Sequence, residues 1–262
     1  MHRRRDRADA GQFLAEGPRA VSEALNEHRR TGAVVVELFC TEGTDVRHPK
    51  IVAAAHELGV LTHVVAEHVA AVLSETRAPQ GVIAVCATPV ASLSTMLATS
   101  PRLLAVLVNV ADPGNAGTVI RAADAAGADA IVFAGTTVDP YNGKCIRASA
   151  GSIFHLPVIS DPAVADVVSA LRDSGLSVLA ADSHAETDIE QADAQGILEH
   201  RTAWFFGHEV RGLAHASGET SLTADSALRI PIHGRAESLN LATAAAICLY
   251  ASARAQRRGA SR

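Results

Sequence analysis

No run of about 18 apolar residues occurs in the sequence, so we expect no membrane-spanning helix. The first residues, MHRRRDRADAGQF, are basic but lack the apolar stretch that a secretory signal peptide requires. The cysteines lie far apart and show the paired spacing of neither a zinc site nor a disulfide framework. We therefore expect a cytoplasmic protein with reduced, structural thiols and no bound metal. The cysteines are Cys40, Cys86, Cys145 and Cys248.

The chain has 262 residues, of which 48% are hydrophobic, and this is enough for one large domain or two smaller ones with apolar cores. The net charge of -5 does not by itself indicate a nucleic-acid-binding protein. Basic residues nevertheless gather at both ends, in HRRRDR at the start and in ARAQRRGASR at the finish. These two segments are either phosphate-contacting arms or solvated tails.

Residues 11–88 alternate between helical and strand patterns, which predicts a small α/β unit whose sheet is covered by helices. In FLAEGPRAVSEALNEHRRTG, Phe13 and Leu14 and then Val21 and Leu25 have helical spacing, and a glycine ends the pattern. Strands are expected at residues 33–43, 60–65 and 81–87, and further helices at 48–59 and 66–80.

A Ser/Thr-rich stretch with proline near both ends, TPVASLSTMLATSPR, indicates a linker. We place a small α/β unit at residues 1–90, the linker at 91–102 and a larger unit at 103–262. The larger unit begins with LLAVLVNV, a continuous apolar strand of the kind that is buried on both faces of a parallel sheet. Further strands are expected at 129–135, 156–159, 176–182, 202–207 and 228–232, and helices at 161–175 and 238–259. We therefore predict a mostly parallel α/β sheet with ligand-binding loops at the strand ends.

The stretch NVADPGNAGTVIRAADAAG, residues 109–127, places a turn and an Ala-rich helix after a buried strand. Asn115 suits the N-cap of a helix beginning near Ala116, and Arg121 could pair with Asp124 on an ordinary helix surface. A helix N-terminus just beyond a parallel strand is also a place where anionic groups bind. The stretch contains no GxGxxG pattern, so a standard dinucleotide-binding fold is not indicated.

Two later stretches carry further polar residues at strand ends. In WFFGHEVRGL, Gly207 ends a buried strand and lets a ligand approach the backbone, and Glu209 is a solvated acid, a helix cap or a functional group. In IPIHGRAESLNLATAAAI, Ser238 and Asn240 lie at the start of a long helix, where such residues are common caps. That helix is apolar nearly all round, which favours packing inside the domain together with a subunit interface.

The three stretches, taken in this order, resemble the three signature motifs of the SpoU, or TrmH-like, family of RNA ribose 2′-O-methyltransferases in the SPOUT superfamily. The resemblance spans residues 103–255 or so. Family members often have methionine at the position of Ile232 and valine at that of Leu241, and both changes nearly conserve volume. On the basis of FLAEGPRAV and TRAPQGVIAV, the N-terminal unit is similar to the substrate-recruiting domain of ribosomal-RNA members.

The resemblance implies an α/β fold with a deep C-terminal trefoil knot, which is a rare topology. It also implies a homodimer whose active sites use both subunits, and S-adenosylmethionine as the methyl donor. The residues that match the family's active-site positions are Asn115, Arg121, Glu209, Ser238 and Asn240. The residues expected to contact the cofactor are Phe206, Gly207, Ile230, Ile232, Gly234, Leu239 and Asn240.

The reaction that follows from the resemblance is methylation of a ribose 2′-hydroxyl in RNA, with ribosomal RNA as the first candidate substrate. Arg121 is the family's candidate for helping the hydroxyl proton leave, but a guanidinium is effectively always charged. Orienting a phosphate and stabilising the developing alkoxide is a simpler role for it, and Glu209 is the conventional candidate base. The alternatives are a transfer-RNA ribose methyltransferase, which typically lacks such an N-terminal unit, and a catalytically inactive RNA-binding homologue.

Overall fold

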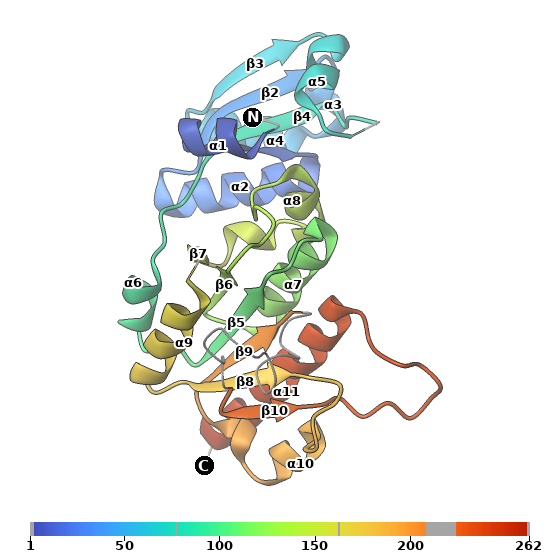
Figure 1. Ribbon diagram of the computed structural model, residues 1–262. Helices are drawn as coiled ribbons and strands as arrows, with labels where there is room; N and C mark the ends of the chain where they lie inside the picture. The colour runs from blue at the N-terminus through green and yellow to red at the C-terminus, as the bar shows by residue number, and fades with distance from the viewer. Residues whose placement is uncertain (1–2, 77, 162, 208–223, 261–262) are drawn as a thin grey trace. The chain divides into compact units, whose positions relative to one another are not determined.

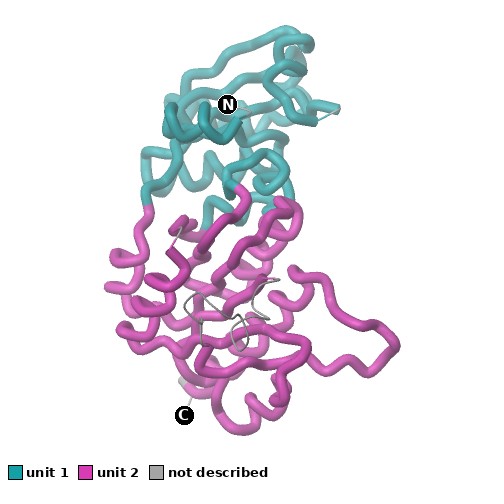
Figure 2. Tube along the Cα trace, viewed as in Figure 1, with its two compact units in different colours: residues 1–90, 139–155 teal, residues 91–138, 156–262 magenta. Residues whose placement is uncertain are grey.

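The structure is a computed structural model that describes residues 3–76, 78–161, 163–207 and 224–260 (Figure 1). The chain divides into two compact units (Figure 2). Unit 1 contains residues 1–90 and 139–155, and unit 2 contains residues 91–138 and 156–262. Each unit is therefore built from two separate stretches of the chain.

Unit 1 contains a four-stranded sheet in the order β1-β4-β2-β3. Strand β4 is antiparallel to both of its neighbours, whereas β2 and β3 are parallel. The strands are β1 (Gln12–Glu16), β2 (Val35–Thr41), β3 (Leu61–Val65) and β4 (Val82–Ala87). The helices of the first stretch are α1 (Arg4–Ala10), α2 (Pro18–Thr31), α3 (Thr44–Arg47), α4 (Pro49–Glu57) and α5 (Glu67–Leu73).

Residues 12–16 form strand β1, where the sequence pattern predicts the first turn of a helix. Phe13 and Ala15 are buried and their neighbours are half-buried, which is the alternation of a strand with one face against a core. Gly17 then adopts a φ of 89°, which favours glycine, and Pro18 takes the first helical position of α2. The Gly-Pro pair therefore separates a strand from a helix, and the prediction of one continuous helix is wrong.

Unit 1 also contains residues 139–155, a stretch that the chain reaches only after the first two strands of unit 2. Its elements are α8 (Gly143–Ser149) and the short 3-10 helix η1 (Ser152–Phe154). Helix α8 lies against β1. The ring of Phe13 contacts the rings of Tyr141 and Phe154, with centroid distances of 4.7 and 5.9 Å. The stretch therefore supplies part of the apolar core of unit 1.

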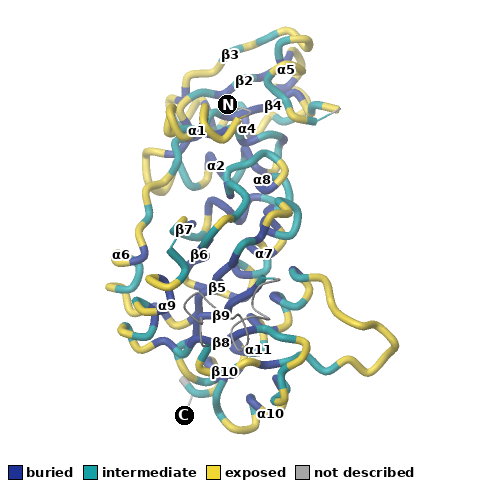
Figure 3. The backbone as a smooth tube through the Cα atoms, in the orientation of Figure 1, coloured by how far each residue is buried: buried dark blue, intermediate teal, exposed yellow. Residues whose placement is uncertain are grey.

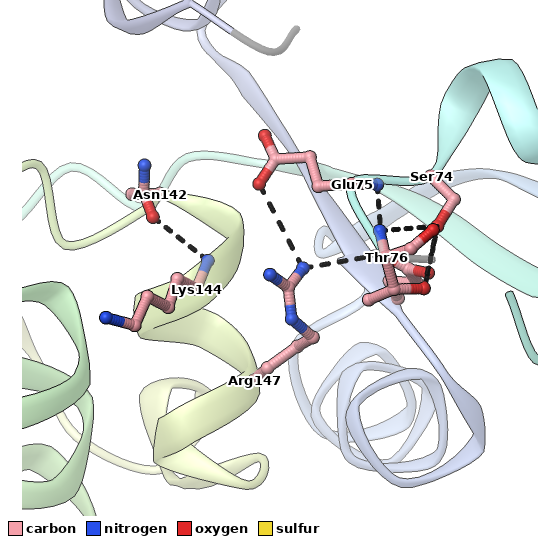
Figure 4. Close-up of polar contacts among 7 residues, drawn as sticks. Ser74, Glu75, Thr76, Asn142, Lys144 and Arg147 are labelled. Atoms are coloured by element: carbon pink, nitrogen blue, oxygen red, sulfur yellow. Dashed lines mark hydrogen bonds and ion pairs between the residues drawn. The ribbon is translucent and has the colours of Figure 1, made fainter. Parts of the chain in front are cut away.

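Polar contacts also join this stretch to the rest of unit 1 (Figure 4). The guanidinium of Arg147 lies 3.5 Å from the carboxylate of Glu16 and 4.0 Å from that of Glu75. Glu16 further accepts hydrogen bonds from the hydroxyl of Ser74 and, at 2.6 Å, from the hydroxyl of Thr76. The negative charge of Glu16 is thus compensated by one cation and two hydroxyl donors.

Unit 2 contains a six-stranded sheet in the order β10-β8-β9-β5-β6-β7, and every neighbouring pair is parallel. The strands are β5 (Leu103–Val108), β6 (Ala130–Ala134), β7 (Val158–Asp161), β8 (Ser177–Ala181), β9 (Thr202–Phe206) and β10 (Ser226–Leu228). The helices are α6 (Leu93–Leu97), α7 (Pro113–Ala126), α9 (Val164–Asp173), α10 (Ile189–Ala194), η2 (Ile197–Glu199) and α11 (Leu241–Ala260). The prediction of a mostly parallel α/β sheet is confirmed.

Helices cover both faces of this sheet, and its central strands are buried along their length (Figure 3). Alternate residues of each strand point to opposite faces. On one face, Leu104 and Val106 of β5 belong to an apolar cluster that includes residues of α6 and α9. On the other face, Trp204 of β9 donates a hydrogen bond from Nε1 to the hydroxyl of Ser252 in α11 at 2.8 Å, and α11 packs along α7. Burial on both faces explains why β5, β6 and β9 are continuous apolar runs in the sequence.

The last strand expected from the sequence, residues 228–232, is mostly irregular chain, because β10 ends at Leu228. Pro231 lacks the backbone N–H that a continuing ladder would need. The chain then runs as an extended loop to α11 (Figure 1). This helix begins at Leu241, three residues after the expected start at residue 238.

All four cysteines are free and buried, as expected of structural thiols. Within the described ranges, no helix is both long enough and apolar enough to cross a membrane. The basic ends are more than solvated tails. Arg7 is buried and forms an ion pair with Asp139, and Arg254 of α11 lies 3.0 Å from the carboxylate of Asp193 in α10.

Candidate active site

Strand β5 ends at Val108 and leads into the turn that precedes α7. Asn109 adopts a positive φ of 52°, which asparagine tolerates better than most residues, and its Oδ1 accepts the Thr136 N–H at 2.7 Å. Asp112 then caps α7, because its Oδ1 accepts the Asn115 N–H at 2.7 Å. The expectation that Asn115 is the N-cap is therefore wrong. The proline after Asp112 takes the first helical position, so the helix begins earlier than expected.

Asn115 and Asn240 join the two helices that begin at this edge of the sheet. Asn240 Nδ2 donates a hydrogen bond to Asn115 Oδ1 at 3.1 Å. Asn240 Oδ1 accepts the Ala242 N–H at 2.9 Å, and the Asn240 carbonyl accepts the Ala244 N–H at 2.9 Å, so Asn240 caps α11. The N-termini of α7 and α11 therefore lie side by side, and both present the positive end of a helix dipole.

Arg121 lies on the exposed side of α7, three residues beyond the exposed Thr118. Steps of three residues keep side chains on one side of a helix, so Asn115, Thr118 and Arg121 form one polar stripe. The opposite side of the helix is apolar and buried, and consists of Ala116, Val119, Ile120 and Ala123. The stripe starts at the helix N-terminus and leaves the guanidinium of Arg121 accessible to a ligand.

A cavity of about 160 Å³ lies at the carboxyl ends of β8, β9 and β10, beside the start of α11. Ligands of open parallel sheets bind at this edge. The lining residues are Ala181, Asp182, Ser183, Phe206, Gly207, Leu228, Ile230, Ile232, Ser238, Leu239, Leu241 and Ala244. Most of this lining is apolar, and its polar side chains come from the loop after β8 and from the loop before α11.

Gly207 directly follows β9, at a point where no side chain fits. A Cβ placed on it would lie 2.2 Å from the carbonyl oxygen of Val108, at the end of the neighbouring strand β5. A larger residue would have to push the two strand ends apart. The sequence suggests that a glycine stands here so that a ligand can approach the backbone. The structure gives a second reason, because the end of β5 leaves no room for a Cβ at this position.

The structure brings most of the expected cofactor residues together. Five of them line the cavity, namely Phe206, Gly207, Ile230, Ile232 and Leu239, and so does the expected active-site residue Ser238. Gly234 is exposed and does not belong to the lining, and Asn240 contacts Asn115. Glu209 and its neighbour His208 lie outside the described residues, so the assignment of Glu209 stays a prediction.

Asp182 and Ser183 line the cavity, although the motifs do not single them out. The signal that could have found them is their position at the end of a predicted strand and directly after it, because the loops at the carboxyl ends of parallel strands meet at one edge. Asp182 carries the only ionisable side chain among the cavity residues that the structure describes. In the same described part of the chain, no group of three or more His, Cys, Asp or Glu residues is arranged to hold a metal ion.

Solved structures share this fold, and relatives share its sequence, along nearly the whole chain. The AdoMet-bound rRNA methyltransferase from Sinorhizobium meliloti superimposes with a TM-score of 0.77 at 28% identity, covering 97% of this chain and 91% of that one. The 23S rRNA (guanosine(2553)-2'-O)-methyltransferase RlmP of Bacillus subtilis is 33% identical over 95% of this chain and 92% of its own length. The 23S rRNA (uridine(2479)-2'-O)-methyltransferase of Streptomyces viridochromogenes is 32% identical over 96% of this chain and 85% of its own length.

Two family profiles match the chain. The SpoU rRNA methylase family matches residues 102–250, and the RNA 2'-O ribose methyltransferase substrate-binding family matches residues 14–90. The chain therefore belongs to the SpoU rRNA methylase family, and the family indicated by the three sequence motifs is confirmed.

Proposed function

We propose that the protein transfers a methyl group from S-adenosylmethionine to the 2′-hydroxyl of a ribose in ribosomal RNA. The observation that carries the proposal is the continuity of two sites. Ser238, Leu239 and Leu241 line the cavity. Asn240, which lies between them in the sequence, bonds to Asn115 at the start of the polar stripe on α7. A methyl donor in the cavity and a ribose at the stripe would therefore be neighbours. Because the proposed substrate is ribosomal RNA, the proposal includes a cytoplasmic location.

The cavity fits the cofactor by its chemistry. Apolar side chains, Phe206 and Leu228 among them, suit an adenine ring and a methylene chain, and Ser183 and Ser238 offer hydroxyls to polar groups. The nearby N-terminus of α11 favours an anionic group such as the carboxylate of the methionine moiety. When bound, S-adenosylmethionine supplies an activated methyl group on a sulfonium.

The residues of the polar stripe would position and activate the ribose. Asn115 is held by Asn240, so its carboxamide is oriented before a substrate arrives, and fixed positioning of two reactants can contribute several kcal/mol, up to about 10. The guanidinium of Arg121 would bind an RNA phosphate and stabilise negative charge developing on the ribose oxygen. Glu209 remains the proposed proton acceptor.

We further propose that the end of unit 2 is knotted. The chain passes from β9 to the edge strand β10, beyond β8, and then returns to α11, which packs against β9 and α7. A trefoil knot forms when such a return path passes through an earlier loop of the chain. This threading would keep Ile230 and Leu239, at the two ends of the loop, beside the strand ends that line the cavity.

The proposal also includes a homodimer. On α11, Ile247 and Tyr250 are 38% and 50% exposed, although Cys248 and Leu249 between them are fully buried. A second copy packed on this side of α11 would cover both side chains. Analytical ultracentrifugation tests this, because a sole species of monomer mass at micromolar concentration would contradict it.

The methyl-transfer proposal is tested with tritiated S-adenosylmethionine and total bacterial RNA fractionated after the reaction. We expect label in the 23S rRNA fraction. Label in transfer RNA alone would favour the other substrate class, and absence of label in all fractions would contradict the activity. Arg121→Ala should bind the cofactor with unchanged affinity by calorimetry and lose transfer. A folded Arg121→Ala protein that no longer binds the cofactor would contradict the role given to Arg121.

A further inference from the structure

Asp182 lines the cavity, and two hydrogen bonds hold it there, one from its backbone and one to its carboxylate. Its backbone N–H donates to the carbonyl of Leu228, the last residue of β10, at 3.0 Å. Its Oδ1 accepts the His184 N–H at 2.9 Å, which closes a small turn. Both Asp182 and Leu228 line the cavity. The position of this negative charge is therefore fixed by the fold and not by a flexible side chain alone.

Methyl transfer changes the charge of the ligand in this cavity. The ribose oxygen forms a bond to the methyl carbon, the bond from that carbon to sulfur breaks, and its electron pair stays on sulfur. The hydroxyl proton leaves to a base or to water. The positively charged sulfonium of the donor thus becomes the neutral thioether of the product, S-adenosylhomocysteine, while the ammonium, carboxylate, ribose and adenine are the same in both.

A fixed negative charge distinguishes these two ligands where the apolar contacts do not. Coulomb attraction grows as the effective dielectric constant falls, and the cavity lining is mostly apolar. We propose that Asp182 is a specificity-determining residue that favours the cationic donor over the neutral product. This inference rests on the proposed function. The charge of Asp182 would attract the ligand less strongly as soon as the methyl group has moved, and this would help the product to leave.

The test is calorimetric titration of wild type and Asp182→Asn with S-adenosylmethionine and, separately, with S-adenosylhomocysteine. Asparagine keeps the Oδ1 acceptor for the His184 N–H and removes only the charge. We expect the affinity for the donor to fall about tenfold, as expected for one desolvated charge interaction, and that for the product to fall less than about twofold. Glu190→Gln, which removes an exposed acid on α10 outside the cavity, is the matched control and should change neither value.

Each outcome separates the two proposals. If wild type binds neither ligand, the proposed function fails. If wild type binds both, and Asp182→Asn weakens both equally or weakens neither, the function stands and the inference about charge is overturned. If Asp182→Asn does not fold, as judged by circular dichroism, Asp182→Ser replaces it, because a serine hydroxyl also accepts the N–H two residues ahead. The same change in affinity ratio is expected for that variant.

Discussion

Arg7 and Asp139 are 132 positions apart in the chain and form a buried ion pair in unit 1. Arg7 donates from Nε to Asp139 Oδ2 at 2.8 Å and donates a second bond from Nη2, and the two side chains are only 6% and 14% exposed. The other carboxylate oxygen of Asp139 accepts the Tyr141 N–H at 2.9 Å. The first helix of the chain is thereby fixed to a stretch that lies between two strands of unit 2 in sequence.

Loss of one partner of this pair should destabilise the protein strongly. Arg7→Met keeps an apolar stem but leaves the Asp139 carboxylate buried without its cation, and we expect the free energy of unfolding to fall by about 3 kcal/mol. Urea denaturation measures it. Arg5→Ala, an 89% exposed arginine paired with Asp9, is the control and should change stability by less than about 0.5 kcal/mol.

The double variant Arg7→Met/Asp139→Asn separates charge pairing from general packing. Asparagine keeps the acceptor for the Tyr141 N–H and removes the unpaired charge, so the double variant should be more stable than Arg7→Met alone. If the double variant loses as much free energy of unfolding as the two single variants together, the ion pair does not contribute to stability and the prediction is wrong.

Removal of residues 1–90 should expose apolar surface on the stretch that remains. Tyr141 and Phe154 would lose their contacts with Phe13, and α8 would lose β1. We expect increased binding of the dye ANS and a lower melting temperature than in the full chain. Replacing residues 139–155 of the truncated protein by a Gly-Ser linker of equal length should reduce ANS binding. A truncated protein that melts like the full chain without binding the dye would show that the stretch does not depend on residues 1–90.

Substitutions of Asn240 should separate its capping role from its contact with Asn115. Asn240→Asp keeps an oxygen for the Ala242 N–H and replaces the donor that faces Asn115, whereas Asn240→Ala removes both contacts. We expect the alanine variant to lose about 1 kcal/mol of stability and the aspartate variant to lose less. Both should reduce the rate of methyl transfer at least about tenfold, as for loss of a positioning contact. Wild-type activity in a folded Asn240→Asp protein would contradict a positioning role for this hydrogen bond.

The stability of unit 1 should fall at high pH because of Tyr141. Burial, and next the negative charge of Asp139, raise the pKa of this phenol above its ordinary value. A group whose pKa is higher in the folded state keeps its full contribution below the unfolded pKa of about 10 and loses it as pH rises through the folded pKa. Tyr141→Phe should therefore reduce the loss of stability above about pH 10. It should also keep or increase stability at pH 8, because the Tyr141 hydroxyl is buried without a hydrogen-bond partner in the structure. Parallel stability curves for wild type and variant from pH 8 to 11 would contradict this.

The central sheet of unit 2 could be predicted from the sequence because a strand buried on both faces is a continuous apolar run. β5 and β9 are continuous apolar runs, and no other common environment favours such short runs followed by polar turns. The edge strand β10 has only three residues, so its pattern is too short to fix its ends. The predicted N-cap of α7 was wrong because the turn contains two residues that can cap a helix, Asp112 and Asn115. The proline that follows Asp112 takes the first helical position, and this makes Asp112 the cap.

Long-range partners could not be predicted in this way. Nothing local marks Asp139 as a partner of Arg7, or Asn240 as a partner of Asn115, because these contacts depend on the path of the whole chain. The resemblance to the family supplied Asn115 and Asn240 as a group, and the structure then showed their hydrogen bond. Asp182 belongs to no signature motif, and the end of a predicted strand is a weak signal, so its place at the cavity is what identifies it.

The position of the transferred methyl group tests the central claim most directly. Purified protein would be incubated with S-adenosylmethionine and unmodified 23S rRNA, and the RNA would be digested to nucleosides for mass spectrometry. The account predicts a gain of one 2′-O-methylnucleoside, absent in the Arg121→Ala reaction. Methylation found on a base, with no ribose methylation, would contradict it.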